Sequence, residues 1–157
     1  MRKKLVKDSR YVQGKFSPLN PSKYKGFWPI IYRSNLELTV FRWLDNNSKV
    51  ISWGSESVVI PYYCPLDGQY NKKLHRYFVD LVVHMLDSNN VSHKLLIEIK
   101  PHKYTQKPTI TPKKSQSTIL YEQTQYVINQ AKWEAAHNWC KKNGYKFLIF
   151  TEKHIKE

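Results

Sequence analysis

The sequence contains only five glycines, and none lies in a Gly-x-x-x-x-Gly-Lys arrangement, which excludes a P-loop ATPase. Its two cysteines, Cys64 and Cys140, have no Cys or His neighbours at zinc-ligand spacing and are typical of reduced thiols in an intracellular protein. No stretch approaches the roughly 20 apolar residues that cross a bilayer, and no apolar stretch follows the basic start. We therefore expect no membrane span, secretory signal or disulfide framework.

Acidic residues are scarce. There are 12 Asp and Glu against 26 Lys and Arg, which gives a formal net charge of +14. Such a charge attracts polyanions, and nucleic acid is the commonest one because neutralised phosphates release counterions. A solubilising surface, or a patch that meets an acidic protein, is the alternative that charge alone leaves open. With 41% hydrophobic and 14% aromatic residues over 157 positions, the chain is expected to fold as a single domain.

The first part of the chain, residues 1–26, is a basic arm whose glycines and prolines predict no long element. Its composition does not decide between a disordered tail and an arm laid along DNA. A helix is predicted to begin at Ser34 and to end within 45–47, because Ser34 and Glu37 have the spacing of a capping box. The segments that follow are two strands, 49–53 and 56–62, joined at Gly54-Ser55, and a polar loop over 64–75.

The second part of the chain alternates strands with loops and a long helix. The predicted elements are a strand over 76–86, a turn-rich segment over 87–93, a strand over 94–100, an exposed basic loop over 101–118, a helix over about 121–142 and a strand over 145–151. The helix is expected to present one stripe of Val127, Ala131, Ala135 and Trp139, and Asn143-Gly144 is a typical C-terminal stop. This order predicts an α/β fold with a mixed sheet of four to five strands flanked by helices.

Two carboxylates interrupt apolar strands, where an unpaired charge is costly to bury. Asp80 lies within Tyr77-Phe-Val-Asp80-Leu-Val-Val, and Glu98 lies within Leu95-Leu-Ile-Glu98-Ile. If residues 76–100 form an antiparallel hairpin centred near Asn89, Asp80 lies directly opposite Glu98. A two-residue turn at Asn89-Asn90 would instead pair Asp80 with Ile99, so the prediction requires an odd-length loop.

Two carboxylates at such a short distance repel each other unless a cation lies between them. Their oxygens suit Mg²⁺ or Mn²⁺, and the backbone carbonyl of Ile99 is a candidate further ligand. Strand alternation places Lys100 on the same face as Glu98. An ammonium there orients a metal-bound water and stabilises charge on an attacked phosphate.

Each of these residues also has a structural interpretation. Asp80 and Glu98 are alternatively members of an ion-pair network with Lys100, Arg76 or His84. Glu37 is alternatively only the closing residue of its capping box, although it also borders the apolar stripe of its helix. His75, His84 and His102 are candidates for auxiliary bases or DNA contacts. The alternative is that each is an ordinary core or solvated histidine.

The order of Glu37 in the first helix, then Val79-Asp80, then Ile97-Glu98-Ile99-Lys100 resembles that of PD-(D/E)xK nucleases, with Val79 in place of the usual proline. The segment Tyr32-Arg-Ser34-Asn-Leu-Glu37 resembles a helix start in phage junction-resolving endonucleases and in endonuclease subunits of bacterial transposases. Two further segments, Asn20 to Ser34 and Val50 to Glu56, resemble the head completion nucleases of T-even-type tailed bacteriophages. This last similarity runs from about residue 15 to the end.

The resemblance implies a restriction-endonuclease-like core and a Mg²⁺- or Mn²⁺-dependent DNA endonuclease that acts in phage head completion after DNA packaging. It makes Glu37, Asp80, Glu98 and Lys100 the catalytic positions, with Asp80, Glu98, Ile99 and Glu37 as metal ligands. We expect DNA contacts at Arg33, Ser34, Lys103 and Lys132.

The expected partners are double-stranded DNA and portal or head–tail connector proteins, in the virion and in the host cytoplasm during assembly. A DNA-binding plug without catalysis, and a junction-resolving or repair-type nuclease, are the alternative functions.

Overall fold

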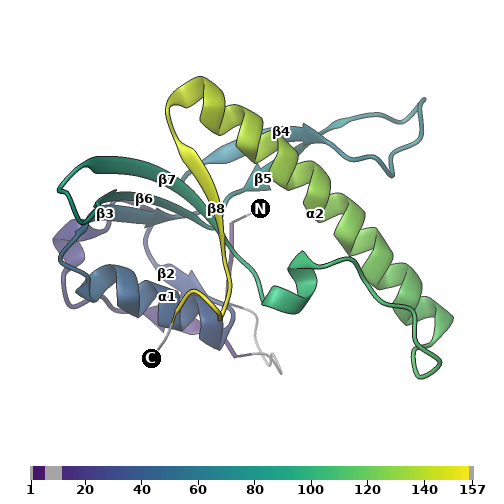
Figure 1. The fold of residues 1–157 in the computed structure, drawn as a ribbon, viewed down its shortest axis with the longest axis horizontal. Helices are drawn as coiled ribbons and strands as arrows, with labels where there is room; N and C mark the ends of the chain where they lie inside the picture. Colours follow the sequence, from purple (N-terminus) through teal and green to yellow (C-terminus); the bar gives the residue numbers. More distant parts are fainter. Residues whose placement is uncertain (1, 6–11, 156–157) are drawn as a thin grey trace.

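The central sheet has four strands and is mixed. A computed structural model describes residues 2–5 and 12–155 and gives the strand order β3-β6-β7-β8. These strands are β3 (Val50–Ser55), β6 (Leu81–Leu86), β7 (Ser92–Ile99) and β8 (Lys146–Phe150). The first three are antiparallel, and β8 joins β7 in parallel (Figure 1). The predicted α/β fold with a mixed sheet is therefore confirmed.

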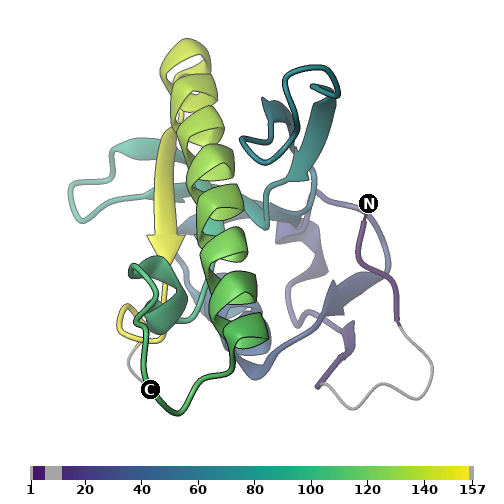
Figure 2. The same cartoon turned by 90° about the vertical axis from the view of Figure 1, so that its right-hand side faces the viewer.

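Helices α1 (Asn35–Asn46) and α2 (Gln116–Asn143) pack on opposite faces of this sheet. Side chains of β7 alternate between two core clusters: Ile97 packs on the α1 side, and Leu96 packs with Trp133 of α2. Figure 2 shows α2 lying across the sheet with β8 beside it. Glu98 alternates with Ile97 along β7 and so faces the α2 side. Among the described residues, no helix is long and apolar enough to span a membrane.

The β6–β7 hairpin has the predicted register. Leu81 lies opposite Ile97, and Val82 lies opposite Leu96. Beyond the ladder, the N–H of Asp87 donates to the carbonyl of Val91 at 2.9 Å, so the loop is the odd-length one over residues 88–90. This register directs Asp80, one position before β6, toward Glu98.

The prediction of one strand over 76–86 is wrong, because these residues form parts of two strands in different sheets. β5 (Leu74–Phe78) pairs with β4 (Val59–Tyr63) in a separate two-stranded sheet. The chain changes sheets at Val79-Asp80. There the N–H of Val79 donates to the carbonyl of Val58 at 3.1 Å, and the carbonyl of Asp80 accepts the N–H of Glu56 at 3.0 Å. Asp80 therefore lies at a break between strands and not within one. Gly54-Ser55, expected to join two strands, lies within β3.

Helix α2 begins at Gln116 and not near Tyr121, because the side chain of Ser115 caps it by accepting the N–H of Thr118. Its buried residues are Asn129, Trp133, Ala136 and Cys140, whereas the predicted stripe of Val127, Ala131, Ala135 and Trp139 is only half-buried. Apolar residues spread over a wide arc of this helix, so their spacing alone does not select the buried face. The predicted stop is confirmed, since Gly144 has a left-handed φ of 74°. The expected basic loop contains a short 3-10 helix, η2 (His102–Thr105).

Residues 12–26 of the basic arm are part of the fold. β1 (Gly14–Phe16) pairs antiparallel with β2 (Ile30–Tyr32), and η1 (Pro21–Lys23) lies between them in the chain. Phe16 packs with Trp53 in the core. Asp45, which is 1% exposed at the end of α1, accepts the N–H groups of Leu19 and Asn20 at 2.7 and 3.0 Å. This segment is thus fixed to α1, while residues 6–11 of the arm lie outside the described residues.

Candidate functional site

Asp80 is held at the end of strand β7. Its Oδ2 accepts the backbone N–H of Ile99 at 2.8 Å. The break between β5 and β6 allows this contact, because a residue within the ladder would have its side chain perpendicular to the sheet. The other oxygen of Asp80 is left for a second partner.

Glu98 is buried on the α2 face and is held by two neighbours. The Tyr77 hydroxyl donates to Glu98 Oε2 at 2.5 Å, and Lys100 Nζ lies 3.7 Å from Glu98 Oε1. Burial and then the charge of Asp80 raise the pKa of Glu98 well above its usual range, although Lys100 and Tyr77 partly offset this. Burial and the charge of Glu98 also raise the pKa of Tyr77, so its hydroxyl stays a donor.

Glu37 closes the cap of its helix with only one of its two carboxylate oxygens. In the helix cap, Ser34 Oγ accepts the N–H of Glu37 at 3.0 Å, and Glu37 Oε2 accepts the N–H of Arg33 at 2.7 Å. The remaining oxygen, Oε1, faces the interior. Burial raises the pKa of Glu37; among the nearby charges Lys3 lowers it and Asp80 raises it, so Glu37 and Asp80 are close enough to interact.

Lys3 joins these two carboxylates, and sequence reasoning missed it. Its Nζ lies 3.1 Å from Glu37 Oε1 and 3.5 Å from Asp80 Oδ1, and its side chain is only 11% exposed. Burial by itself would lower the pKa of Lys3, but the charges of Asp80, Glu37 and Glu56 outweigh it and raise the pKa. The sequence shows that residues 1–26 are basic, but no spacing in it indicates which of their lysines contacts the carboxylates.

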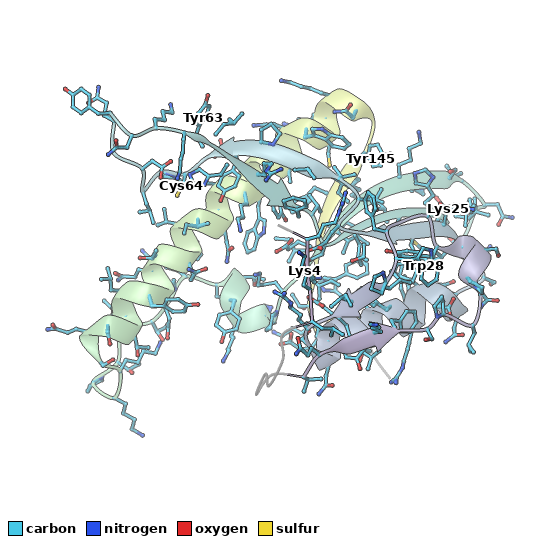
Figure 3. All side chains as sticks on the ribbon, turned by 180° about the vertical axis from the view of Figure 1, so that it is seen from behind. Lys4, Lys25, Trp28, Tyr63, Cys64 and Tyr145 are labelled. Atoms are coloured by element: carbon cyan, nitrogen blue, oxygen red, sulfur yellow. The ribbon has the colours of Figure 1, made fainter. Side chains whose placement is uncertain are left out.

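The segment around Lys3 is fixed by three further contacts. Lys3 N–H donates to Glu56 Oε2 at 2.7 Å, and the Arg33 guanidinium donates to the carbonyl of Lys4 at 2.7 Å. The guanidinium of Arg2 lies 3.4 Å from the centre of the Phe27 ring. In the view from behind, Lys4 lies near the middle of the molecule, between helix α2 and Trp28 (Figure 3). Arg33, predicted to contact DNA, is thus engaged by the N-terminal segment.

The remaining lysines and histidines that were predicted as site residues lie at different distances from the carboxylates. Lys132 lies 5.6 Å from the centre of the Tyr77 ring, which places it near Glu98, and Lys103 lies over Tyr104 at 4.7 Å. His75 bonds to Asp67, His84 packs against the ring of Tyr145, and the backbone of His102 donates to Glu152. Of the proposed partners in an ion-pair network, Lys100 contacts Glu98, whereas the Arg76 guanidinium lies near the Phe78 ring.

The arrangement is a row of three carboxylates with Asp80 in the middle. Asp80 shares Lys3 with Glu37 on one side and interacts with Glu98 on the other. Among residues 2–5 and 12–155, no three or more His, Cys, Asp or Glu side chains are gathered closely enough to hold one metal ion as they stand. The structure therefore brings the predicted residues together with an ammonium group between two of them.

Two known groups of proteins are similar to this chain. Residues 47–152 match the family described as TnsA-like endonuclease N terminal. The chain is also 43% identical over 143 residues to the head completion nuclease of Enterobacteria phage T4, which covers 88% of this chain and 90% of that protein. The family match includes Asp80, Glu98 and Lys100, whereas Glu37 and Lys3 precede it.

Glu98→Gln should stabilise the metal-free protein at about pH 8 by roughly 1 kcal/mol or more, because it removes a buried charge beside Asp80. The pKa of Glu98 is higher in the folded than in the unfolded protein, so its protonation stabilises the fold. This stabilisation is fully present below the unfolded-state pKa of about 4.3. That stability is lost as pH rises through the raised pKa, and Gln avoids the loss. The gain in melting temperature should therefore shrink toward about pH 4.5.

Glu134→Gln, at an exposed position on α2, is the control and should change the melting temperature little at either pH. A Glu98→Gln gain that is the same at both pH values would contradict the raised pKa of Glu98.

Proposed function

The chain belongs to the family of TnsA-like endonuclease N-terminal domains, and on this premise we propose that it is a metal-dependent DNA endonuclease. Its role would be to hydrolyse phosphodiester bonds in completing the phage head after DNA packaging. The 43% identity to a head completion nuclease over most of both chains supports this role, and the net charge of +14 supports a DNA substrate. In that role its partners would be portal or head–tail connector proteins, in the host cytoplasm and in the virion.

The observation that carries the proposal is the Lys3 ammonium between Glu37 and Asp80. A buried cation there stands in for a metal ion, because it is bound by carboxylate oxygens that would otherwise repel each other. The residues fit Mg²⁺ or Mn²⁺: Asp80 and Glu98 would hold the ion, with Glu37 and the carbonyl of Ile99 as further oxygen ligands. When bound, such an ion polarises the scissile phosphate and lowers the pKa of water.

The protein's own groups would orient the reaction. The N–H of Ile99 and the hydroxyl of Tyr77 fix one oxygen each of Asp80 and Glu98. Lys100, 3.7 Å from Glu98, donates to the attacked phosphate or to the water that attacks it. Hydrolysis adds water across the P–O bond and needs no covalent enzyme intermediate.

Lys100→Met should reduce cleavage of linear and supercoiled duplex DNA about 100-fold or more, because the ammonium that stabilises phosphate charge is lost. Lys94→Met, at an exposed position on the same strand, should cut like the wild type. EDTA should abolish cutting by both wild type and control. Normal cutting by Lys100→Met would refute the site assignment. A folded wild type that binds DNA in a salt-sensitive way but never cuts would favour the plug without catalysis.

Lys3→Gln should lower the melting temperature of metal-free protein and enlarge the upward shift caused by Mg²⁺ or Mn²⁺. The ammonium and the ion compete for Glu37 and Asp80, so its removal should tighten metal binding about tenfold, worth about 1.4 kcal/mol. Lys4→Gln, whose side chain is exposed, should leave both quantities unchanged. A smaller metal-induced shift in Lys3→Gln would show that the ammonium does not take the place of the ion.

A further inference from the structure

A groove of about 780 Å³ lies between the segment that follows β7 and the first half of helix α2. Its lining begins at Lys100, so the groove adjoins the candidate catalytic residues. The segment runs from the end of β7 through η2 to the beginning of α2, beside this helix (Figures 1 and 2). Apart from Lys100, the proposed hydrolysis uses no residue that lines this groove.

The groove is strongly basic. Four lysines and one glutamate line it, namely Lys100, Lys103, Lys107, Lys114 and Glu122. Glu122 is matched by Lys114, whose Nζ lies 2.9 Å from its carboxylate. Because Lys100 lies 3.7 Å from Glu98, the excess positive charge of the groove comes mainly from Lys103 and Lys107. This charge complements a row of phosphates.

Tyrosines line the same groove. Tyr104 and Tyr121 are 49% and 66% exposed, and Tyr126 also lines the groove. Exposed rings beside lysines provide flat surfaces on which bases can stack. The ammonium of Lys103, 4.7 Å from the centre of the Tyr104 ring, adds a charge beside one of these surfaces.

The walls of the groove are held by hydrogen bonds. Lys114 Nζ donates to the carbonyl of Thr109 at 2.9 Å, and Thr105 Oγ1 donates to the carbonyl of His102 at 2.7 Å. His102 N–H donates to Glu152 at 2.9 Å, which ties η2 to the segment after β8. A groove that is already formed loses less conformational entropy on binding.

We propose that this groove binds single-stranded DNA that adjoins the scissile phosphate, so that the preferred substrate is a duplex with an unpaired tail. Lysines with exposed aromatic rings are the chemistry that binds single strands, because the charges follow the backbone and the rings stack on bases. A duplex keeps its bases stacked inside and would leave the tyrosine rings without a partner. This inference rests on the proposed nuclease function and specifies its substrate.

The test compares binding of full-length protein to three labelled DNAs in EDTA: a single strand, a blunt duplex and the same duplex with a single-stranded tail. The double variant Tyr104→Ala/Tyr121→Ala should weaken binding of the single strand and the tailed duplex about tenfold or more. Binding of the blunt duplex should change less than about twofold. The melting temperature should stay near that of wild type, because both side chains are exposed.

The matched control is Tyr63→Ala/Tyr70→Ala, which removes two tyrosines that are 52% and 97% exposed elsewhere. Tyr63 also has a lysine over its ring, since Lys72 lies 4.6 Å from its centre. This control should bind all three DNAs like the wild type. Equal weakening of all three DNAs by the groove variant, or no weakening of the tailed duplex, would overturn the proposal.

Failure of the groove and failure of the nuclease give different results. If wild type cuts DNA with metal but the groove variant keeps its preference for tailed duplex, only the groove assignment is refuted. If the tyrosines determine tailed-duplex binding but wild type does not cut with Mg²⁺ or Mn²⁺, the nuclease is refuted and the groove stands.

Discussion

Repulsion between Asp80 and Glu98 is the constraint on which the rest of the site depends. Burial disfavours the charged form of Glu98, and the nearby charge of Asp80 disfavours it further. The protein offsets this with one donor for each, Ile99 N–H and Tyr77 O–H, and with ammonium groups on both sides. Such an arrangement is costly to stability, and a neutral side chain at either position would be cheaper. The proposed metal-dependent function accounts for the presence of both acids.

The fold creates this proximity by interrupting a strand. Because the chain passes from the β4–β5 sheet to the central sheet at Val79-Asp80, the Asp80 side chain lies beside the end of β7. The same strand end carries Lys100 into the basic groove beside α2. The candidate site therefore connects a charge-compensated carboxylate row with a surface suited to nucleic acid, and α1 contributes Glu37 from the opposite side of the sheet.

Sequence reasoning predicted the features that depend on residues near one another in the chain. The Ser34 cap, the Gly144 stop and the β6–β7 register follow from local spacing and loop length. The change of sheet at Val79 was missed because an apolar run looks the same in one strand or two. Lys3 was missed because its contacts depend on tertiary folding. The choice of Glu37, Asp80, Glu98 and Lys100 as catalytic positions came from family resemblance, since spacing alone left an ion-pair network as an alternative.

The central claim is that Asp80 is part of a divalent-cation site. The most direct measurement is titration of the purified protein with Mn²⁺, followed by electron paramagnetic resonance, for wild type, Asp80→Asn and Asp87→Asn. Asp87 lies in the β6–β7 turn and bonds to His93, so its variant controls for the loss of one acid. Wild type and Asp87→Asn should bind Mn²⁺ alike, and Asp80→Asn should bind it about tenfold or more weakly. Equal binding by Asp80→Asn, or no binding by folded wild type, would contradict this claim.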